Sequence, residues 1–298
     1  MTRCFLVRYP LLTGAAPRVA APATVLAAAA ILFAGVPAGL PSADAVPHAH
    51  TQGCANGFDC DLAARIESVN AYLDSRPGVT GYVVRDRQTG AVYASPHAED
   101  MVFTASTIKL AIASDLLNRA RVGAIALPPE DRQLMEQMMS TSNDQATDIL
   151  WTKHSGLDGQ AFNNAFRANG MTSLRPEPTP NGRPNWGFQK TTAADLDRLM
   201  SNVLDRMHPD DRGYLTDLMR RVDSNQHWGV WGAGPAMRPG LKNGWSEEQG
   251  GWVVNSVGFA GPGERYTLAI MTAMNGEGGY QEGAETDTTI AEKLLAGR

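Results

Sequence analysis

The sequence predicts an α+β fold: an antiparallel sheet built from both ends of the chain and flanked by helices, with an all-helical lobe inserted in the middle. The order of local patterns predicts it. A helical pattern and a strand hairpin come first, helical patterns fill the middle, and strands with a closing helix come last. We therefore expect a catalytic cleft where the sheet meets the helical lobe.

The first 45 residues have the pattern of a secretory signal peptide. Three arginines accompany an apolar, alanine-rich run over residues 25–40, and Ala43-Asp44-Ala45 follows as a small-residue cleavage pattern. A membrane anchor is the alternative, but Pro37 and Pro41 interrupt a run that is already short for a bilayer span. We expect an exported protein, secreted or held in the cell envelope, after cleavage near Ala45. No later stretch has the length and apolarity of a membrane span.

Residues 46–60 are predicted to form an N-terminal tail with a cysteine loop. Cys4 leaves with the signal peptide, and Cys54 and Cys60 remain in an exported chain, where a disulfide is favoured over a reactive thiol or a metal pair. A lipid anchor on Cys54 is the weaker interpretation, because Thr51-Gln52-Gly53 lacks the apolar residue expected before a lipidated cysteine.

A single catalytic domain is predicted over residues 61–298, and it begins with a helix and a hairpin. Residues 61–75 place apolar side chains at helical intervals. Residues 81–86 and 91–93 are β-rich runs separated by a polar, glycine-containing turn.

The helical lobe is predicted over about residues 106–207. The helical patterns of the lobe and of the segment after it cover residues 107–121, 130–139, 145–153, 193–206 and 212–222. The first of these is apolar on most sides, so this helix should lie deep in the fold. Four prolines in residues 175–187 exclude regular structure there and predict a loop.

The last part of the chain is predicted to supply strands and a closing helix. Residues 240–243, 252–257 and 266–272 have strand patterns, and residues 286–296 have a helical pattern. These strands are expected to pair with the first hairpin.

Three short segments carry the chemistry: Ser106-Thr107-Ile108-Lys109, Ser142-Asn143-Asp144 and Lys242-Asn243-Gly244, in this order. They resemble the three signatures of the penicillin-recognising serine enzymes, closest to the class A β-lactamases and, more finely, to secreted actinobacterial members. The resemblance implies a β-lactamase/transpeptidase-like fold and a serine nucleophile. The sequence departs from the family pattern where Asn143 and Asp144 are exchanged and where Asn243 replaces a hydroxyl residue.

Ser106 and Lys109 have the spacing that an activated serine requires. Three residues apart on a helix, both side chains project from one face within hydrogen-bonding reach. Lys109 can take a proton only when it is neutral, so its pKa must fall by about three units from ~10.4, through burial and through a second cation, Lys242. We expect Lys242 to be the more exposed lysine and to stay charged. An N-cap serine and a surface lysine are the structural alternatives.

The resemblance implies roles for the second segment. Ser142 would relay a proton to the leaving nitrogen, and its structural alternative is an N-cap. Asp144 would place a carboxylate where the family binds a substrate amide.

The third segment would bind the substrate. Lys242 would hold a substrate carboxylate, beside Asn243. Gly244 would let the substrate approach the strand backbone, and the Trp245 N–H would complete an oxyanion hole with that of Ser106. The structural alternative is a charge at a turn or strand edge.

Glu177 is the candidate for activating the water that hydrolyses the acyl-enzyme. Residues 175–181 match the Arg-x-Glu-Pro-x-x-Asn pattern of the class A loop that carries this glutamate. The loop lacks the acid that should pair with Arg175, and a solvated loop acid is therefore the alternative.

The charge and residue content of the sequence exclude several classes of binding partner. Residues 1–45 carry three arginines and one aspartate, so the net charge of −5 becomes −7 after cleavage, and no basic patch is present to bind nucleic acid. No spaced set of metal ligands occurs, and no cofactor is implied.

The sequence therefore predicts a monomeric serine hydrolase that acts through an acyl-enzyme on a small β-lactam or a peptidoglycan-peptide-like substrate. Hydrolysis of the β-lactam amide bond, and thus antibiotic resistance, is the first interpretation. A D-alanyl peptidase or esterase on the same scaffold and a non-catalytic cell-wall binding protein are the alternatives.

Overall fold

The computed structural model describes residue 54 and residues 57–298. These residues belong to one compact unit, His50–Arg298. The predicted signal peptide and its cleavage site lie outside the described residues.

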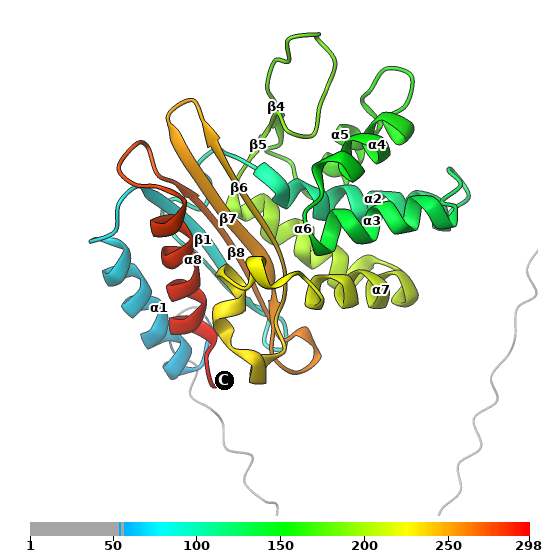
Figure 1. Cartoon of the computed structure of the whole chain (residues 1–298). Helices are drawn as coiled ribbons and strands as arrows, with labels where there is room; N and C mark the ends of the chain where they lie inside the picture. The colour runs from blue at the N-terminus through cyan, green and yellow to red at the C-terminus, as the bar shows by residue number, and fades with distance from the viewer. Residues whose placement is uncertain (1–53, 55–56) are drawn as a thin grey trace, which may run out of the picture. The chain divides into compact units, whose positions relative to one another are not determined.

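A five-stranded antiparallel sheet forms the centre of this unit, with strand order β2-β1-β8-β7-β6 (Figure 1). The strands are β1 (Val79–Asp86), β2 (Ala91–Ala94), β6 (Gly240–Glu248), β7 (Gly251–Ala260) and β8 (Tyr266–Ala273). Because β1 pairs with β8, strands from both ends of the chain meet in one sheet. The predicted α+β fold is confirmed.

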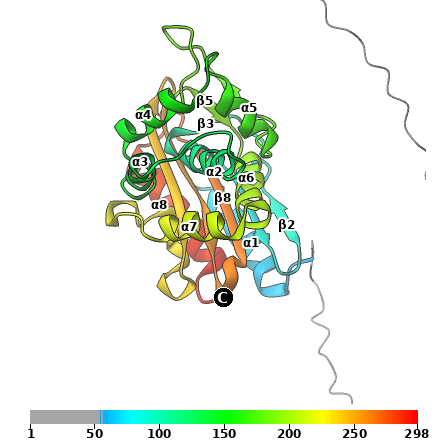
Figure 2. The ribbon, with the colours of Figure 1, turned by 90° about the vertical axis from the view of Figure 1, so that its right-hand side faces the viewer.

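Helices cover both faces of the sheet (Figures 1 and 2). On one face lie α1 (Cys60–Leu73) and α8 (Tyr280–Leu295), and α8 begins six residues earlier than the sequence pattern predicts. The helices on the other side are α2 (Ile108–Arg121), α3 (Pro129–Ser140), α4 (Asp144–His154), α5 (Ala161–Ala168), α6 (Ala193–Arg206) and α7 (Pro209–Arg220). All but α5 were expected from hydrophobic periodicity.

The interior is apolar on both sides of the sheet. The larger core cluster joins α2, the other lobe helices and the inner face of β7 and β8, and a second cluster joins α1 and α8 to the opposite face. The α2 helix is buried almost all round, as its sequence predicts, because it runs through the lobe behind the sheet.

A second, three-stranded sheet corrects one prediction. It contains β3 (Val102–Phe103), β5 (Gln189–Thr191) and β4 (Arg175–Pro176) in the order β3-β5-β4. The expectation that residues 175–187 hold no regular structure is wrong at the first two positions. Pro176 is tolerated because β4 lies at the edge of its sheet, where a missing N–H costs no ladder bond.

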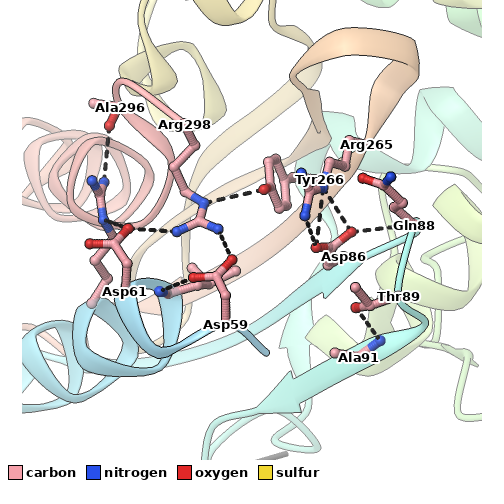
Figure 3. A network of polar contacts seen from close by, with 12 residues as sticks. Asp59, Asp61, Asp86, Gln88, Thr89, Ala91, Arg265, Tyr266, Ala296 and Arg298 are labelled. Carbon is pink, nitrogen blue, oxygen red and sulfur yellow. Dashed lines mark hydrogen bonds and ion pairs between the residues drawn. The ribbon is translucent and has the colours of Figure 1, made fainter. Parts of the chain in front are cut away.

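Polar contacts fasten the chain ends to the sheet (Figure 3). Arg298 donates to Asp59 and, at 2.6 Å, to Asp61, and Arg265 donates to Asp86 at 2.6 Å. We call Asp59, Asp61, Asp86, Arg265 and Arg298 the arginine network.

The start of α1 is also fastened covalently. Cys54 and Cys60 form the predicted disulfide, with their Cα atoms 5.0 Å apart. Within residues 57–298, no helix has the length and apolarity needed to cross a membrane.

Candidate active site

Ser106 lies on a 3₁₀ turn, Ala105–Thr107, that leads directly into α2. Ala105 has a φ of 44°, a left-handed conformation that an alanine rarely adopts. Thr107 donates its hydroxyl to Thr104 O at 2.6 Å, which closes the turn. Ser106 is partly exposed although both of its neighbours are buried. The turn thus presents the serine at the surface of a rigid element, and strain of this kind is common at functional sites.

Strands of both sheets hold this turn in place. Thr104 N donates to Gln189 O at 2.9 Å, and the Asn255 amide donates to Phe103 O at 2.9 Å. On β6, a Cβ added to Gly244 would lie 2.7 Å from Ser106 N. Only glycine permits this approach of β6 to the turn.

Lys109, one helical turn after Ser106, is fully buried. Its ammonium donates to Ser142 O at 2.7 Å and to Asp144 Oδ1 at 2.5 Å, and lies 3.3 Å from Ser142 Oγ. It also lies 4.7 Å from the centre of the Trp186 ring. Burial lowers the pKa of Lys109, and the hydrogen bond and charge of Asp144 oppose that shift.

Ser142 connects the two lysines. It lies between α3 and α4 with a φ of 58°, and its hydroxyl oxygen is 3.1 Å from Lys242 Nζ as well as near Lys109. Asn143 caps α4 by accepting from Ala146 N at 2.9 Å. Because Asn143 takes the cap, Asp144 becomes the first residue of α4 and turns its carboxylate to Lys109.

Lys242 corrects an expectation about exposure. Its side chain is fully buried, so Lys242 is not the more exposed lysine. The amine contacts Gln226 Oε1 at 3.3 Å and Asn243 O at 2.6 Å. Burial first, and then the charge of Lys109, hold the pKa of Lys242 well below its usual range. The 3₁₀ turn Ser224–Gln226 lies over Lys242, and the strand pattern of β6 gave no sign of this cover.

Asn243 and Trp245 point to the other face of β6. Asn243 is fully buried, donates to Gln226 O and Trp228 O at 2.9 and 3.2 Å, and accepts from Ser256 Oγ at 2.7 Å. Trp245 packs beside Trp228. Lys242 and the Cα of Gly244 lie on the side of β6 that faces the Ser106 turn, and the side chains of Asn243 and Trp245 do not, because side chains alternate along a strand. We call Lys109, Ser142, Asp144 and Lys242 the lysine cluster.

Glu177 lies apart from the lysines. Arg175 Nε donates to its carboxylate at 2.9 Å, and Lys190 Nζ is 3.7 Å from the same oxygen. Glu177 N donates to Phe188 O, which continues the pairing of β4 with β5. Because β5 separates this segment from the Ser106 turn, the two backbones are two strand spacings, roughly 10 Å, apart. Within the described residues, no hydrogen bond or ion pair joins Glu177 to Ser106 or Lys109.

Three further residues surround the lysine cluster. Gln226 contacts Lys242, Trp186 covers Lys109, and Asp148 accepts from Trp186 Nε1 at 2.7 Å. Asp148 has a detectable sequence signal, since it is four residues after Asp144 and lies on the same face of α4. Gln226 has none, because its contact depends on a long-range approach of two segments.

Comparison with known proteins identifies the family. A model of the beta-lactamase enzyme family matches residues 129–296. The chain belongs to the beta-lactamase enzyme family. This match includes Ser142, Glu177 and Lys242 and begins after Ser106 and Lys109. Assignment of the nucleophile therefore depends on the motif and the geometry.

Individual proteins are also similar to this chain. The chain is 28% identical over 220 residues to proteins of Mycobacterium tuberculosis and Mycobacterium bovis named "Putative lipoprotein LppW", covering 70% of this chain and 68% of theirs. A beta-lactamase structure from Xanthomonas campestris matches with a TM-score of 0.62 and 18% identity, over 78% of this chain and 96% of that one. The structure of an ancestral class A beta-lactamase of Gram-negative bacteria matches with a TM-score of 0.63 and 19% identity, over 78% of this chain and 98% of that one. These structures show the fold.

Proposed function

We propose that this protein is an exported serine hydrolase that forms an acyl-enzyme at Ser106, with the amide bond of a β-lactam as its substrate. One observation carries the proposal: the Ser142 hydroxyl lies between the amines of Lys109 and Lys242, where β6 packs against the Ser106 turn. Serine, hydroxyl relay and two lysines are the groups that attack and proton transfer require. The family match and the fold support it.

Attack would proceed from the Ser106 hydroxyl onto the carbonyl carbon. The oxyanion would bind the backbone N–H groups of Ser106 and Trp245, beside the close approach of Gly244 to the turn. The Ser142 hydroxyl would then give a proton to the leaving nitrogen.

We assign the hydrolysis of the acyl-enzyme to a water activated by Glu177, and we expect this step to be slow. The Glu177 carboxylate is engaged by Arg175 and Lys190, so it must leave at least one of them to reach a water near Ser106. An acyl-enzyme that forms quickly and clears slowly would accumulate.

Asp144 favours a second candidate, a D-alanyl peptidase or esterase. Its side chain is 70% exposed, and a carboxylate accepts hydrogen bonds from N–H groups. A peptide substrate offers such groups.

The cell envelope is the proposed location. Residues 1–45 have the signal-peptide pattern, and the mycobacterial relatives are named as lipoproteins.

Two reagents test the function. A fluorescent penicillin should label the protein covalently, and a chromogenic cephalosporin should be hydrolysed. Ser106→Ala should abolish both signals, whereas Ser140→Ala, which removes a hydroxyl bonded to its own helix at Glu136 O, should keep both. Stable labelling without hydrolysis would favour the peptidase or esterase, and absence of both signals would leave a non-catalytic wall-binding protein.

Glu177 has a separate test. Glu177→Gln should increase the acylated fraction in intact-mass spectra and slow hydrolysis of the cephalosporin. Unchanged turnover would remove Glu177 from the reaction.

A further inference from the structure

The two buried lysines differ in their partners. Lys109 faces the carboxylate of Asp144 at 2.5 Å. Lys242 contacts an amide oxygen, a carbonyl and a hydroxyl, and within the described residues it forms no ion pair. The two amines therefore have one carboxylate between them, and it contacts Lys109.

The contacts of Lys109 suit an ammonium. Ser142 O and Asp144 Oδ1 accept hydrogen bonds and donate none, and Ser142 Oγ is the third neighbour. An ammonium has three protons to donate, which matches these three oxygens, and the carboxylate among them, which Lys242 lacks, favours the charged form.

The contacts of Lys242 suit a neutral amine. The Gln226 Nε2 group donates to Ser140 O at 2.6 Å, and this bond turns Oε1 toward Lys242. Gln226 Oε1 and Asn243 O take the two protons of a neutral amine, and its lone pair remains for the hydroxyl proton of Ser142. With Lys242 neutral, Ser142 would accept from Lys109 and donate to Lys242 across the 3.1 Å that separates Ser142 Oγ from Lys242 Nζ.

We propose that Lys242 is the neutral amine and Lys109 the permanent cation of this site, so that Lys242, through Ser142, takes the proton of Ser106, with Gln226 as its positioning residue. This inference rests on the proposed function and reverses the roles that the sequence motifs suggest. The exchange of Asn143 and Asp144 is its cause, since it puts the carboxylate on Lys109.

The charges in and around the lysine cluster agree with this assignment. The charged groups that act on Lys242 are Lys109 from α2 and Asp144 from α4. Asp148, also on α4, acts in addition on Lys109 and favours its charged form. The 3₁₀ turn contributes the neutral amide of Gln226, and β6 contributes a carbonyl. Two ammonium groups sharing one hydroxyl would repel each other, so the amine without a carboxylate is the one that loses its proton.

The proton transfers balance. As Ser106 Oγ forms its bond to the carbonyl carbon, its proton passes to Ser142 Oγ and the Ser142 proton passes to Lys242 Nζ. When the tetrahedral intermediate collapses, the C–N bond breaks, and Lys242 returns the proton through Ser142 to the leaving nitrogen. Lys109 keeps its charge throughout and, 3.3 Å from Ser142 Oγ, stabilises the negative charge that develops on this oxygen during the relay.

A direct test is nuclear magnetic resonance of the protein labelled with isotopes in its five lysines. The side-chain signals distinguish amine from ammonium, and Lys109→Arg and Lys242→Arg assign them by loss of a peak. At neutral pH, we expect the amine signature for Lys242 and the ammonium signature for Lys109. The opposite pattern, or two ammonium signatures, overturns the inference even in an active hydrolase.

A kinetic test compares the same two variants. Arginine keeps a positive charge and cannot act as a base. We expect Lys242→Arg to lower the acylation rate at least a hundredfold and Lys109→Arg to lower it much less, with folding checked by circular dichroism. Equal losses or the reverse order contradict the proposal.

Gln226→Glu supplies a third test without changing either lysine. A carboxylate 3.3 Å from Lys242 would hold its proton, so acylation at neutral pH should fall about a hundredfold and recover as the pH rises. Gln133→Glu makes the same chemical change at an exposed position of α3 and serves as the matched control. Absence of the pH-dependent recovery counts against Lys242 as the base. If the signals confirm a neutral Lys242 but no variant or wild-type protein is acylated, the proposed function fails and the charge assignment stands.

Discussion

The arginine network and the lysine cluster both place cations beside carboxylates, but they balance charge differently. In the network, Arg265 binds Asp86 through two nitrogens, and Arg298 binds Asp59 and Asp61 (Figure 3). In the lysine cluster, Lys109 and Lys242 have only Asp144 as a carboxylate partner among the described residues.

The difference separates stabilisation from chemistry. A matched guanidinium and carboxylate have no reason to exchange a proton, because arginine keeps its charge. Two lysines that share one carboxylate and one hydroxyl hold a proton that can move. The unmatched region is therefore the one suited to catalysis, and the matched region fastens the chain ends to the sheet.

The largest expected effect comes from removing the hydroxyl that the lysines share. Ser142→Ala should slow acylation by about a hundredfold to ten-thousandfold, the range lost when a general acid or base is disconnected. Stopped-flow hydrolysis of a chromogenic cephalosporin measures the rate. Thermal stability should change little, because alanine fits the same space. A rate within threefold of the wild type would show that Ser142 is not the relay.

The matching change in the network should affect stability and not acylation. Asp86→Asn leaves Arg265, whose side chain is 32% exposed, without its charged partner, and we expect the free energy of unfolding to fall by about 1 kcal/mol. Urea denaturation measures this loss. An acylation rate that falls together with stability would mean that the two regions are coupled.

The network also predicts a pH dependence. Burial by itself would raise the pKa of Asp86, but the hydrogen bonds and charge of Arg265 and the Gln88 N–H lower it overall. A carboxyl with a depressed pKa stabilises the fold above its unfolded value, ~3.9, and loses this contribution as the pH falls through the folded value. The stability difference between wild type and Asp86→Asn should therefore narrow below about pH 4.

Local sequence patterns predicted much of the fold but fewer of the contacts in the lysine cluster. The buried α2 and the strands of the large sheet follow from periodicity within each segment. Helix α5 was missed because three polar residues interrupt its short apolar pattern, and β4 was missed because two residues, one of them proline, pair only in the presence of β5. Local patterns are informative where an element determines its own structure.

Residues that act across segments were beyond such reasoning. The motif placed Lys109 and Ser142 as candidates, and the structure brings them together. The burial of Lys242 and the role of Gln226 arise when a turn 16 residues earlier in the chain folds over β6. No spacing within a segment encodes that contact.

A smaller effect is expected from removing the carboxylate of the lysine cluster, and it tests which lysine titrates. The charge of Asp144 raises the pKa of both lysines, so Asp144→Asn should lower the pKa of Lys242. A base is active above its pKa, and the acid limb of the acylation profile should therefore move to lower pH. Asp148→Asn is the control, because Asp148 acts on Lys109 and is not among the charges that act on Lys242. A limb that moves with Asp148→Asn would identify Lys109 as the titrating base.

The smallest expected effect concerns the ring over Lys109. Trp186→Leu removes a cation–π contact at 4.7 Å, worth about 1 kcal/mol, and opens Lys109 to water. If Lys109 is a permanent cation, water replaces the ring as a partner of the ammonium, and acylation should change less than tenfold. If Lys109 were instead the neutral base, exposure would raise its pKa toward its usual value and disable it at neutral pH. The pH profile of acylation in Trp186→Leu distinguishes these cases, because only a base at Lys109 would shift the acid limb to higher pH.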